Sequence, residues 1–138
     1  MGLDQYLYGA TYKIDKETHS HEIKLEEVAY WRKQNAIHKW FVDNVQEGVD
    51  NCAIYSFDDY FLKRLLVVCK KVLENPTAEN AMKFLPTQEG FFFGGTDLTN
   101  NFELEYYLDG LKYAVEVIRE LLKDNKYDYY CYRSSWWD

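Results

Sequence analysis

The chain has 138 residues, of which 47% are hydrophobic and 18% are aromatic, and it carries a formal net charge of −7. This length predicts a single domain, 1–138, with its own hydrophobic core. The acidic balance argues against a general nucleic-acid-binding protein, because such proteins need a basic surface. The sequence holds no run of about 18 or more apolar residues, so we expect neither a membrane span nor a membrane partner.

The cysteine and histidine content predicts no metal centre. The chain has three cysteines, an odd number, at Cys52, Cys69 and Cys131, and their spacing is not that of metal ligands. This pattern indicates reduced thiols in a cytoplasm. His19 and His21 stand together in a charged stretch without further ligands nearby in the sequence. We therefore expect no metal and no cofactor. Cys69 falls on the apolar face of a predicted helix and is expected in the core.

The N-terminal segment predicts a strand followed by a loop. Leu3–Ile14 is rich in Tyr, Leu and Thr, a composition typical of a strand. Gly9 in its middle predicts a bulge or a close approach to the backbone at that point. The polar segment Asp15–Glu22 predicts a loop, and Ile23–Ala29 fits either a strand or the start of a helix.

One helix is predicted over Tyr30–Gln46. Its apolar residues recur with the helical period of about 3.6 residues, and Gly48 would end it. Those residues are Trp31, Ile37, Phe41 and Val45. Cys52–Phe57 then has the composition of a short strand.

The second half of the chain predicts helices with recognisable start signals. Asp58 is expected to cap a helix that runs to Glu74. Thr77–Phe84 predicts a short helix capped by Thr77, and Phe102–Lys123 predicts a long amphipathic one. Tyr127–Arg133 predicts a final strand.

These elements predict the order β-α-β-α-(α)-β-α-β, with one strand placed in Leu85–Gly95. Such an order favours the α+β class. We expect a small single domain whose mostly antiparallel sheet packs with three main helices.

The predicted helix over Tyr30–Gln46 carries an unusual polar face. Trp31, Asn35 and His38 would share that face at i, i+4 and i+7. The Trp31 ring can stack on a base, and the Asn35 amide and the His38 imidazole can hydrogen-bond a sugar or base. Arg32 and Lys33 can pair with phosphates. The alternative is an ordinary core helix with Trp31 inward and its cations solvated.

A second candidate region lies in residues 85–96, where glycines bracket three phenylalanines. Phe91 and Phe93 would share one face of a strand, and Thr87 and Gln88 could offer hydrogen bonds to a ligand. The segment lacks the Gly-Lys-Ser/Thr sequence of a P-loop. The alternative is a buried strand with a glycine turn.

The last residues before the C-terminus include two neighbouring tryptophans. Exposed rings at a free end would favour association, so Trp136 and Trp137 are expected to dock on the domain or on a partner subunit. We expect a homo-oligomer with these rings as candidate contacts.

Four stretches along the chain form a recognisable set. They are MGLDxYL at 1–7, YWRKxNxIHKWFV at 30–42, LPTQxGFFFG at 85–94 and SSW at 134–136. Together they resemble a family of small bacteriophage and prophage proteins. Such accessory proteins act in host takeover or counter-defence, and some phage proteins sequester cyclic dinucleotides or cyclic ADP-ribose isomers. The resemblance implies a counter-defence protein in the cytoplasm of the infected bacterial host.

Three functions follow from these observations. The leading one is binding and sequestration of a nucleotide-derived immune signal without catalysis, with Trp31, Arg32, Lys33, Asn35, His38, Thr87, Gln88, Phe91 and Phe93 as the ligand-binding residues. The alternative is a protein-protein inhibitor of a host defence factor. The second alternative is a nucleotide-processing enzyme, for which the sequence offers no nucleophile or metal pattern and therefore no catalytic residue.

Overall fold

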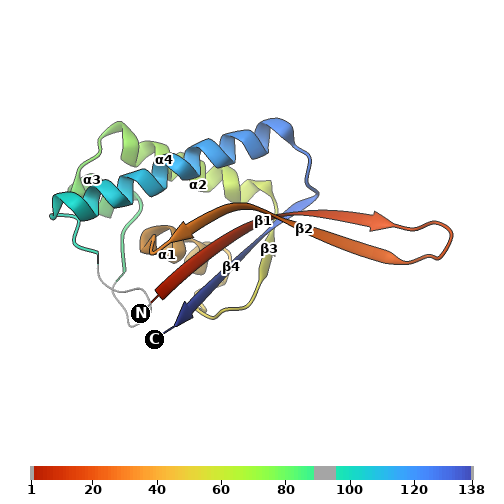
Figure 1. Cartoon of the computed structure of the whole chain (residues 1–138). Coiled ribbons are helices and arrows are strands. Elements are labelled where there is room, and N and C mark those ends of the chain that lie inside the picture. The colour runs from red at the N-terminus through yellow and green to blue at the C-terminus, as the bar shows by residue number, and fades with distance from the viewer. Residues whose placement is uncertain (1, 89–95, 138) are drawn as a thin grey trace.

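Four strands in one antiparallel sheet form the base of the fold, and the helices gather over one side of it (Figure 1). The computed structural model describes residues 2–88 and 96–137. Its elements, in chain order, are β1 (Gly2–Ile14), β2 (His21–Arg32), α1 (Asn35–Asn44), β3 (Tyr55–Phe57), α2 (Asp59–Glu74), α3 (Ala78–Phe84), α4 (Asn101–Asp124) and β4 (Tyr129–Trp137). The strand order is β2-β1-β4-β3, and the predicted α+β class is confirmed.

The core lies between the sheet and the helices. Side chains of a strand alternate between its two faces, and Leu3 and Leu7 of β1 point to the buried side. Tyr132 of β4 lies on the same side, and its ring stacks on Phe41 of α1 with centroids 3.9 Å apart. The helices α2 and α4 close the core above, and Cys69 of α2 is buried there as predicted.

The helices of the second half begin where the sequence predicts. The side chain of Asp58 accepts a hydrogen bond from the backbone N–H of Tyr60 at 3.1 Å, and that of Thr77 accepts one from Asn80 at 3.2 Å. Asn100 caps α4 in the same way with two backbone N–H groups. Each cap satisfies donors that have no partner within the helix, which fixes the starting residue locally.

The predicted helix over Tyr30–Gln46 is wrong in its first third. Strand β2 continues through Trp31 to Arg32, and α1 starts only at Asn35. Pairing with β1 places Trp31 opposite Gln5, and this pairing buries the indole in the core. Tertiary burial therefore overrides the helical period that the apolar residues suggest. The ambiguous segment Ile23–Ala29 belongs to the same strand.

The predicted element order is corrected by this change, because two strands now precede the first helix. The short strand predicted over Cys52–Phe57 is present only at Tyr55–Phe57. The final strand is longer than predicted. It includes Trp136 and the backbone of Trp137, which pair in register with Leu3 and Gly2 of β1.

The close approach predicted at Gly9 is present. A Cβ atom built on Gly9 would overlap the ring of Tyr127, which lies directly over this point of β1. The bulge itself lies beside it, where the register with β2 shifts between Leu7 and Tyr8. Gly9 therefore leaves room for the ring, whose hydroxyl donates to a carboxylate oxygen of Glu26 at 2.6 Å.

We predict that Gly9→Ala lowers the free energy of unfolding by about 1–3 kcal/mol, because the methyl group displaces a packed ring. Urea denaturation followed by fluorescence measures this loss. In a Tyr127→Ala background the same substitution should cost much less, since the ring is absent. An equal cost in both backgrounds would show that Tyr127 is not the cause.

Candidate functional site

A pocket of about 240 Å³ opens where the turn between β2 and α1 meets the first half of α4. It is lined by Lys33, Gln34, Asn35, Thr96, Phe102, Glu103, Tyr106 and Tyr107. Ligand sites commonly enclose roughly 300–1,000 Å³. This pocket is slightly smaller, so it suits one ring system with a short substituent.

Asn35 lines the pocket, and its side chain carries a buried hydrogen-bond acceptor. Its side-chain nitrogen donates to the carbonyl oxygen of Gln88 at 3.2 Å and to Oγ1 of Thr96 at 2.8 Å. A carbonyl oxygen can only accept, so the amide orientation is determined by these contacts. Its Oδ1 is buried and has no hydrogen-bond partner within the described residues. Such an atom carries a desolvation cost that a ligand donor would remove.

Lys33 brings a positive charge to the same pocket. It stands between β2 and α1 with φ of 54°, a left-handed conformation that residues other than glycine rarely adopt. Its backbone N–H donates to the carbonyl oxygen of Leu3 at 2.9 Å, which fixes the turn. The turn directs the chain from the sheet into α1, so Lys33 and Asn35 line one pocket together.

Gln34 joins the turn to both the sheet and α4. Its backbone N–H donates to Oε1 of Gln5 at 2.9 Å, and its carbonyl oxygen accepts from Nε2 of Gln5 at 3.1 Å. Its own Nε2 donates to the carbonyl oxygen of Tyr106 at 2.8 Å. A Cβ on Gly110 would overlap the Gln34 amide, so a glycine is needed beneath it. These contacts fix the pocket wall before any ligand arrives.

The opposite wall comes from the first turns of α4. Phe102 is 85% exposed, which is unusual for so large an apolar ring, and Tyr106 lies one turn further along. The hydroxyl of Tyr106 donates to the carbonyl oxygen of Arg32, and that of Tyr107 donates to the carbonyl oxygen of Leu85. Glu103 adds a carboxylate. The wall therefore offers aromatic surface beside an acceptor.

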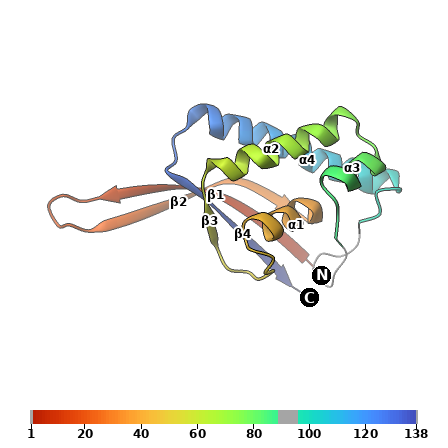
Figure 2. The same ribbon diagram turned by 180° about the vertical axis from the view of Figure 1, so that it is seen from behind.

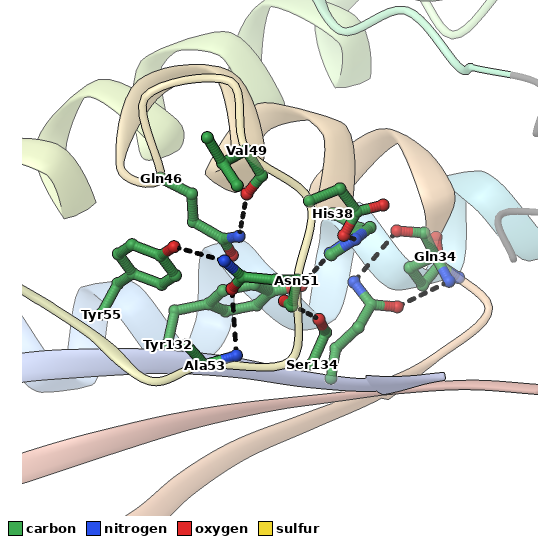
Figure 3. Close-up of polar contacts among 11 residues, drawn as sticks. Gln34, His38, Gln46, Val49, Asn51, Ala53, Tyr55, Tyr132 and Ser134 are labelled. Atoms are coloured by element: carbon green, nitrogen blue, oxygen red, sulfur yellow. Dashed lines mark hydrogen bonds and ion pairs between the residues drawn. The ribbon is translucent and has the colours of Figure 1, made fainter. Parts of the chain in front are cut away.

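His38 lies outside this pocket, in a buried polar network (Figure 3). Its Nδ1 is 2.7 Å from the hydroxyl of Tyr132, and its Nε2 is 2.9 Å from a carboxylate oxygen of Asp50. His38 and Tyr132 are fully buried. The imidazole thus connects α1, β4 and the segment after α1.

The rest of that network holds the segment between α1 and β3 against the sheet. In Figure 3 the Asn51 side chain lies between Tyr55 and the backbone of Ala53, contacting them at 2.9 and 3.0 Å. The hydroxyl of Ser134 donates to the carbonyl oxygen of Asn51 at 3.4 Å. Gln46 donates to the carbonyl oxygen of Val49 at 2.8 Å. Nearly every partner is a backbone group or neighbouring side chain, which indicates a structural role.

The structure separates residues that the sequence analysis placed on one face. Trp31 is buried in the core, where its Nε1 donates to the carbonyl oxygen of Gly110 at 3.3 Å. Arg32 is exposed and does not line the pocket. The shared helical face of Trp31, Asn35 and His38 does not exist, because the first of these residues belongs to β2. Lys33 and Asn35 do lie together in the pocket wall.

The second predicted region meets the pocket only through its ends. The Gln88 carbonyl oxygen contacts Asn35, whereas the hydroxyl of Thr87 is 3.6 Å from the sulfur of Met82. Phe91 and Phe93 lie outside the described residues. The predictions for these two rings therefore stay predictions.

Sequence reasoning missed the contribution of α4, namely Phe102, Glu103, Tyr106 and Tyr107, together with Gln34 and Thr96. One signal was present. Phe102 and Tyr106 are four residues apart, beside the apolar stripe that passes through Leu104, Leu108 and Leu111. Two aromatic residues outside a core stripe indicate a second apolar surface.

Comparisons with protein-family models, with curated proteins and with solved structures found no match to this chain. Within residues 2–88 and 96–137, no helix has the length and apolar character needed to cross a bilayer. The same residues contain no group of three or more His, Cys, Asp or Glu that could hold a metal ion.

Buried phenol and thiol groups predict a loss of stability at high pH. Burial raises the pKa of the Tyr132 hydroxyl well above its usual value and raises the pKa of the Cys69 thiol to about 12. In the unfolded chain such groups lose their protons near pH 8.5 to 10. Above about pH 9 the unfolded state thus binds fewer protons than the folded state, and the free energy of unfolding falls.

Tyr132→Phe should flatten this decline above about pH 10, by up to about 1.4 kcal/mol for each pH unit. At neutral pH the variant should be about 1–3 kcal/mol less stable, because the hydroxyl beside His38 is lost. Urea denaturation across the alkaline range measures both effects. Parallel pH profiles for the variant and the original chain would contradict the prediction.

Proposed function

We propose that this protein binds a small nucleotide-derived molecule in the pocket between the β2–α1 turn and α4, without changing it chemically. The observation that carries the proposal is the buried Oδ1 of Asn35, an acceptor without a partner in the described part of the chain. A ligand N–H or O–H group is its natural complement, such as the exocyclic amine of a nucleobase or a sugar hydroxyl.

The other lining groups favour the same ligand class. The exposed ring of Phe102 offers a stacking surface, and stacking of a base on an aromatic ring contributes roughly 1–3 kcal/mol. Lys33 can pair with a phosphate, and Glu103 can accept a further hydrogen bond. A nucleotide has a planar ring, hydrogen-bond donors and an anionic phosphate, and these groups complement the aromatic ring, the acceptors and the cation of the pocket. The volume of about 240 Å³ suits one such unit, so a cyclic dinucleotide would extend beyond the pocket.

Binding without catalysis is the form of this proposal that the residues support best. His38 was the one histidine among the predicted ligand-binding residues, and it lies in the buried network rather than in the pocket lining. The lining residues named above include no cysteine, serine or histidine. They can hold and orient a ligand. Within the described residues, no hydrogen bond joins a lysine, threonine or tyrosine of the lining to a side chain that could activate it as a nucleophile.

The biological role proposed here is counter-defence. A protein that holds a nucleotide-derived immune signal keeps it from its receptor, and this would act in the cytoplasm of the infected bacterial host. The support for this step is the resemblance to small phage and prophage proteins described above. A sponge needs affinity near the nanomolar range, or about −12 kcal/mol. One stacked ring with three or four charged hydrogen bonds approaches that range before ordering costs.

Isothermal titration with adenosine 5′-monophosphate and with adenosine tests the proposal. Lys33→Asn removes the cation but keeps a residue type that tolerates positive φ. It should weaken binding of the monophosphate by about tenfold to a hundredfold and leave adenosine binding unchanged. Phe102→Ala should weaken both ligands by about fivefold to a hundredfold.

Tyr60→Ala is the matched control for Phe102→Ala, because Tyr60 is also an exposed aromatic residue in the first turn of a helix. It should bind both ligands like the original chain. Cyclic di-adenosine monophosphate carries one negative charge on each phosphodiester, fewer than the terminal phosphate of the monophosphate, so Lys33→Asn should weaken its binding by no more than that of the monophosphate. Unchanged binding in both pocket variants would overturn the site, and conversion of a ligand to product would support an enzyme instead.

A further inference from the structure

The apolar residues of β1 change faces along the strand. In the first half Leu3 and Leu7 are buried against the helices, and both stand at odd positions. Beyond Gly9 the large apolar residues are Tyr12 and Ile14, at even positions. Successive side chains of a strand point to opposite faces. The apolar side of β1 therefore moves from the helix-covered face of the sheet to the helix-free face.

The partner strand repeats this change. Register places Ile23 opposite Tyr12 and Leu25 opposite Ala10, and directly opposite residues share a face. The other face of this hairpin carries charge, with Lys13 opposite Glu22. The hairpin formed by the ends of β1 and β2 is thus amphipathic. Its apolar face is turned away from the helices.

Figures 1 and 2 show this hairpin extending well beyond the helices and the rest of the sheet. Its apolar side chains are consequently exposed. Tyr12 is 43% exposed, Ile14 and Ile23 are each 55% exposed, and Leu25 is 43% exposed. Strict alternation of apolar and polar residues is typical of strands with one buried face. Within the single chain, nothing in the described residues covers these four side chains.

The same face continues over the body of the sheet as a tyrosine surface. Tyr6 stacks beside Tyr8, with ring centroids 6.3 Å apart, and contacts Tyr30 at 5.4 Å. The guanidinium of Arg133 lies 4.8 Å from the centre of the Tyr6 ring. We name the whole helix-free surface of β1, β2 and β4 the open face. Tyrosine and arginine are enriched at protein interfaces.

We propose that the open face binds the open face of a second copy of this chain, so that two sheets pack face to face. A twofold contact covers both apolar hairpins with one interface, because each copy presents the same surface to the other. Aligned sheets of this kind pack about 10 Å apart with interdigitating side chains. A two-stranded hairpin is only marginally stable alone, so each arm would also gain support from the contact.

The charge distribution favours a second copy over an unlike partner. The chain carries a net charge of −7, so most surfaces of two copies repel each other. The open face is the exception, since Arg32 and Arg133 stand there beside the carboxylates of Asp4 and Glu27, and the four charges balance. Two open faces can therefore meet without bringing an excess of negative charge together. A twofold arrangement can set Asp4 of one copy near an arginine of the other.

The area is sufficient for a stable dimer. A large side chain buries roughly 150–250 Å². The exposed fractions of five side chains on this face then correspond to an exposed area on the order of 400–500 Å² in total. These side chains are Tyr12, Ile14, Ile23, Leu25 and Tyr30. A standard interface buries roughly 800 Å² on each partner. The partly exposed Tyr6, Tyr8 and Tyr129 and their polar neighbours lie on the same face and supply the remainder.

Sedimentation velocity over the micromolar concentration range tests this proposal. The original chain should show a dimer that dissociates on dilution. The double variant Ile14→Thr and Ile23→Thr keeps β-branched residues and so keeps the strands. It should raise the dimer dissociation constant by about a hundredfold or more. Lys13→Thr with Glu22→Thr introduces the same residue at two paired positions on the opposite face, keeps the net charge at −7 and should leave the dimer intact.

A monomer at every concentration would overturn the proposal, as would a dimer that the Ile14→Thr, Ile23→Thr variant does not weaken. Capture of an acidic host protein by that face, with no self-association, would also overturn it. Circular dichroism of both variants checks that the strands remain. The pocket residues do not belong to the open face, so nucleotide binding should survive in the monomeric variant, and the two proposals fail separately.

Discussion

The hydrogen bonds between the Gln5 side chain and the backbone of Gln34 are the constraint on which the rest of the site depends. Gln34 occupies the N-cap position of α1, but its own side chain does not cap the helix. The buried amide of Gln5 satisfies its backbone N–H and carbonyl groups instead, from the middle of β1. The Gln34 side chain is thereby free to contact α4 at Tyr106. One amide thus fixes where β2 ends, where α1 begins and how α4 is placed.

The same constraint explains how much of the fold could be predicted from the sequence. The helices capped by Asp58, Thr77 and Asn100 carry their start signals beside them in the chain, and their limits were predicted within a residue or two. The boundary between β2 and α1 carries no such signal. It depends on Gln5, far away in the sequence, and on the burial of Trp31 against α4. Apolar periodicity detects neither contact, so it extended the helix into the strand.

The candidate site was predictable to the same limited degree. Lys33 and Asn35 were found because a cation and an amide near aromatic residues indicate ligand binding. Trp31 and His38 were attractive for the same reason. Strand pairing buries Trp31 in the core, and hydrogen bonds to the half-buried carboxylate of Asp50 and the buried phenol of Tyr132 hold His38. The wall from α4 required knowing that residues about seventy positions apart meet. The open face was equally hidden. It depends on a shift of the apolar residues from odd to even positions along β1, and on the register that pairs β1 with β2.

The placement of the three thiols has a practical consequence. Cys52 is exposed, whereas Cys69 and Cys131 are buried, and burial raises the pKa of both buried thiols. A thiolate is the species that attacks maleimides and disulfides. Such reagents should therefore label Cys52 alone in the native protein, which gives a single position for a fluorophore between α1 and β3. Slow labelling of Cys69 would then report opening of the layer between α2 and the sheet, and so measure how cooperatively the core unfolds.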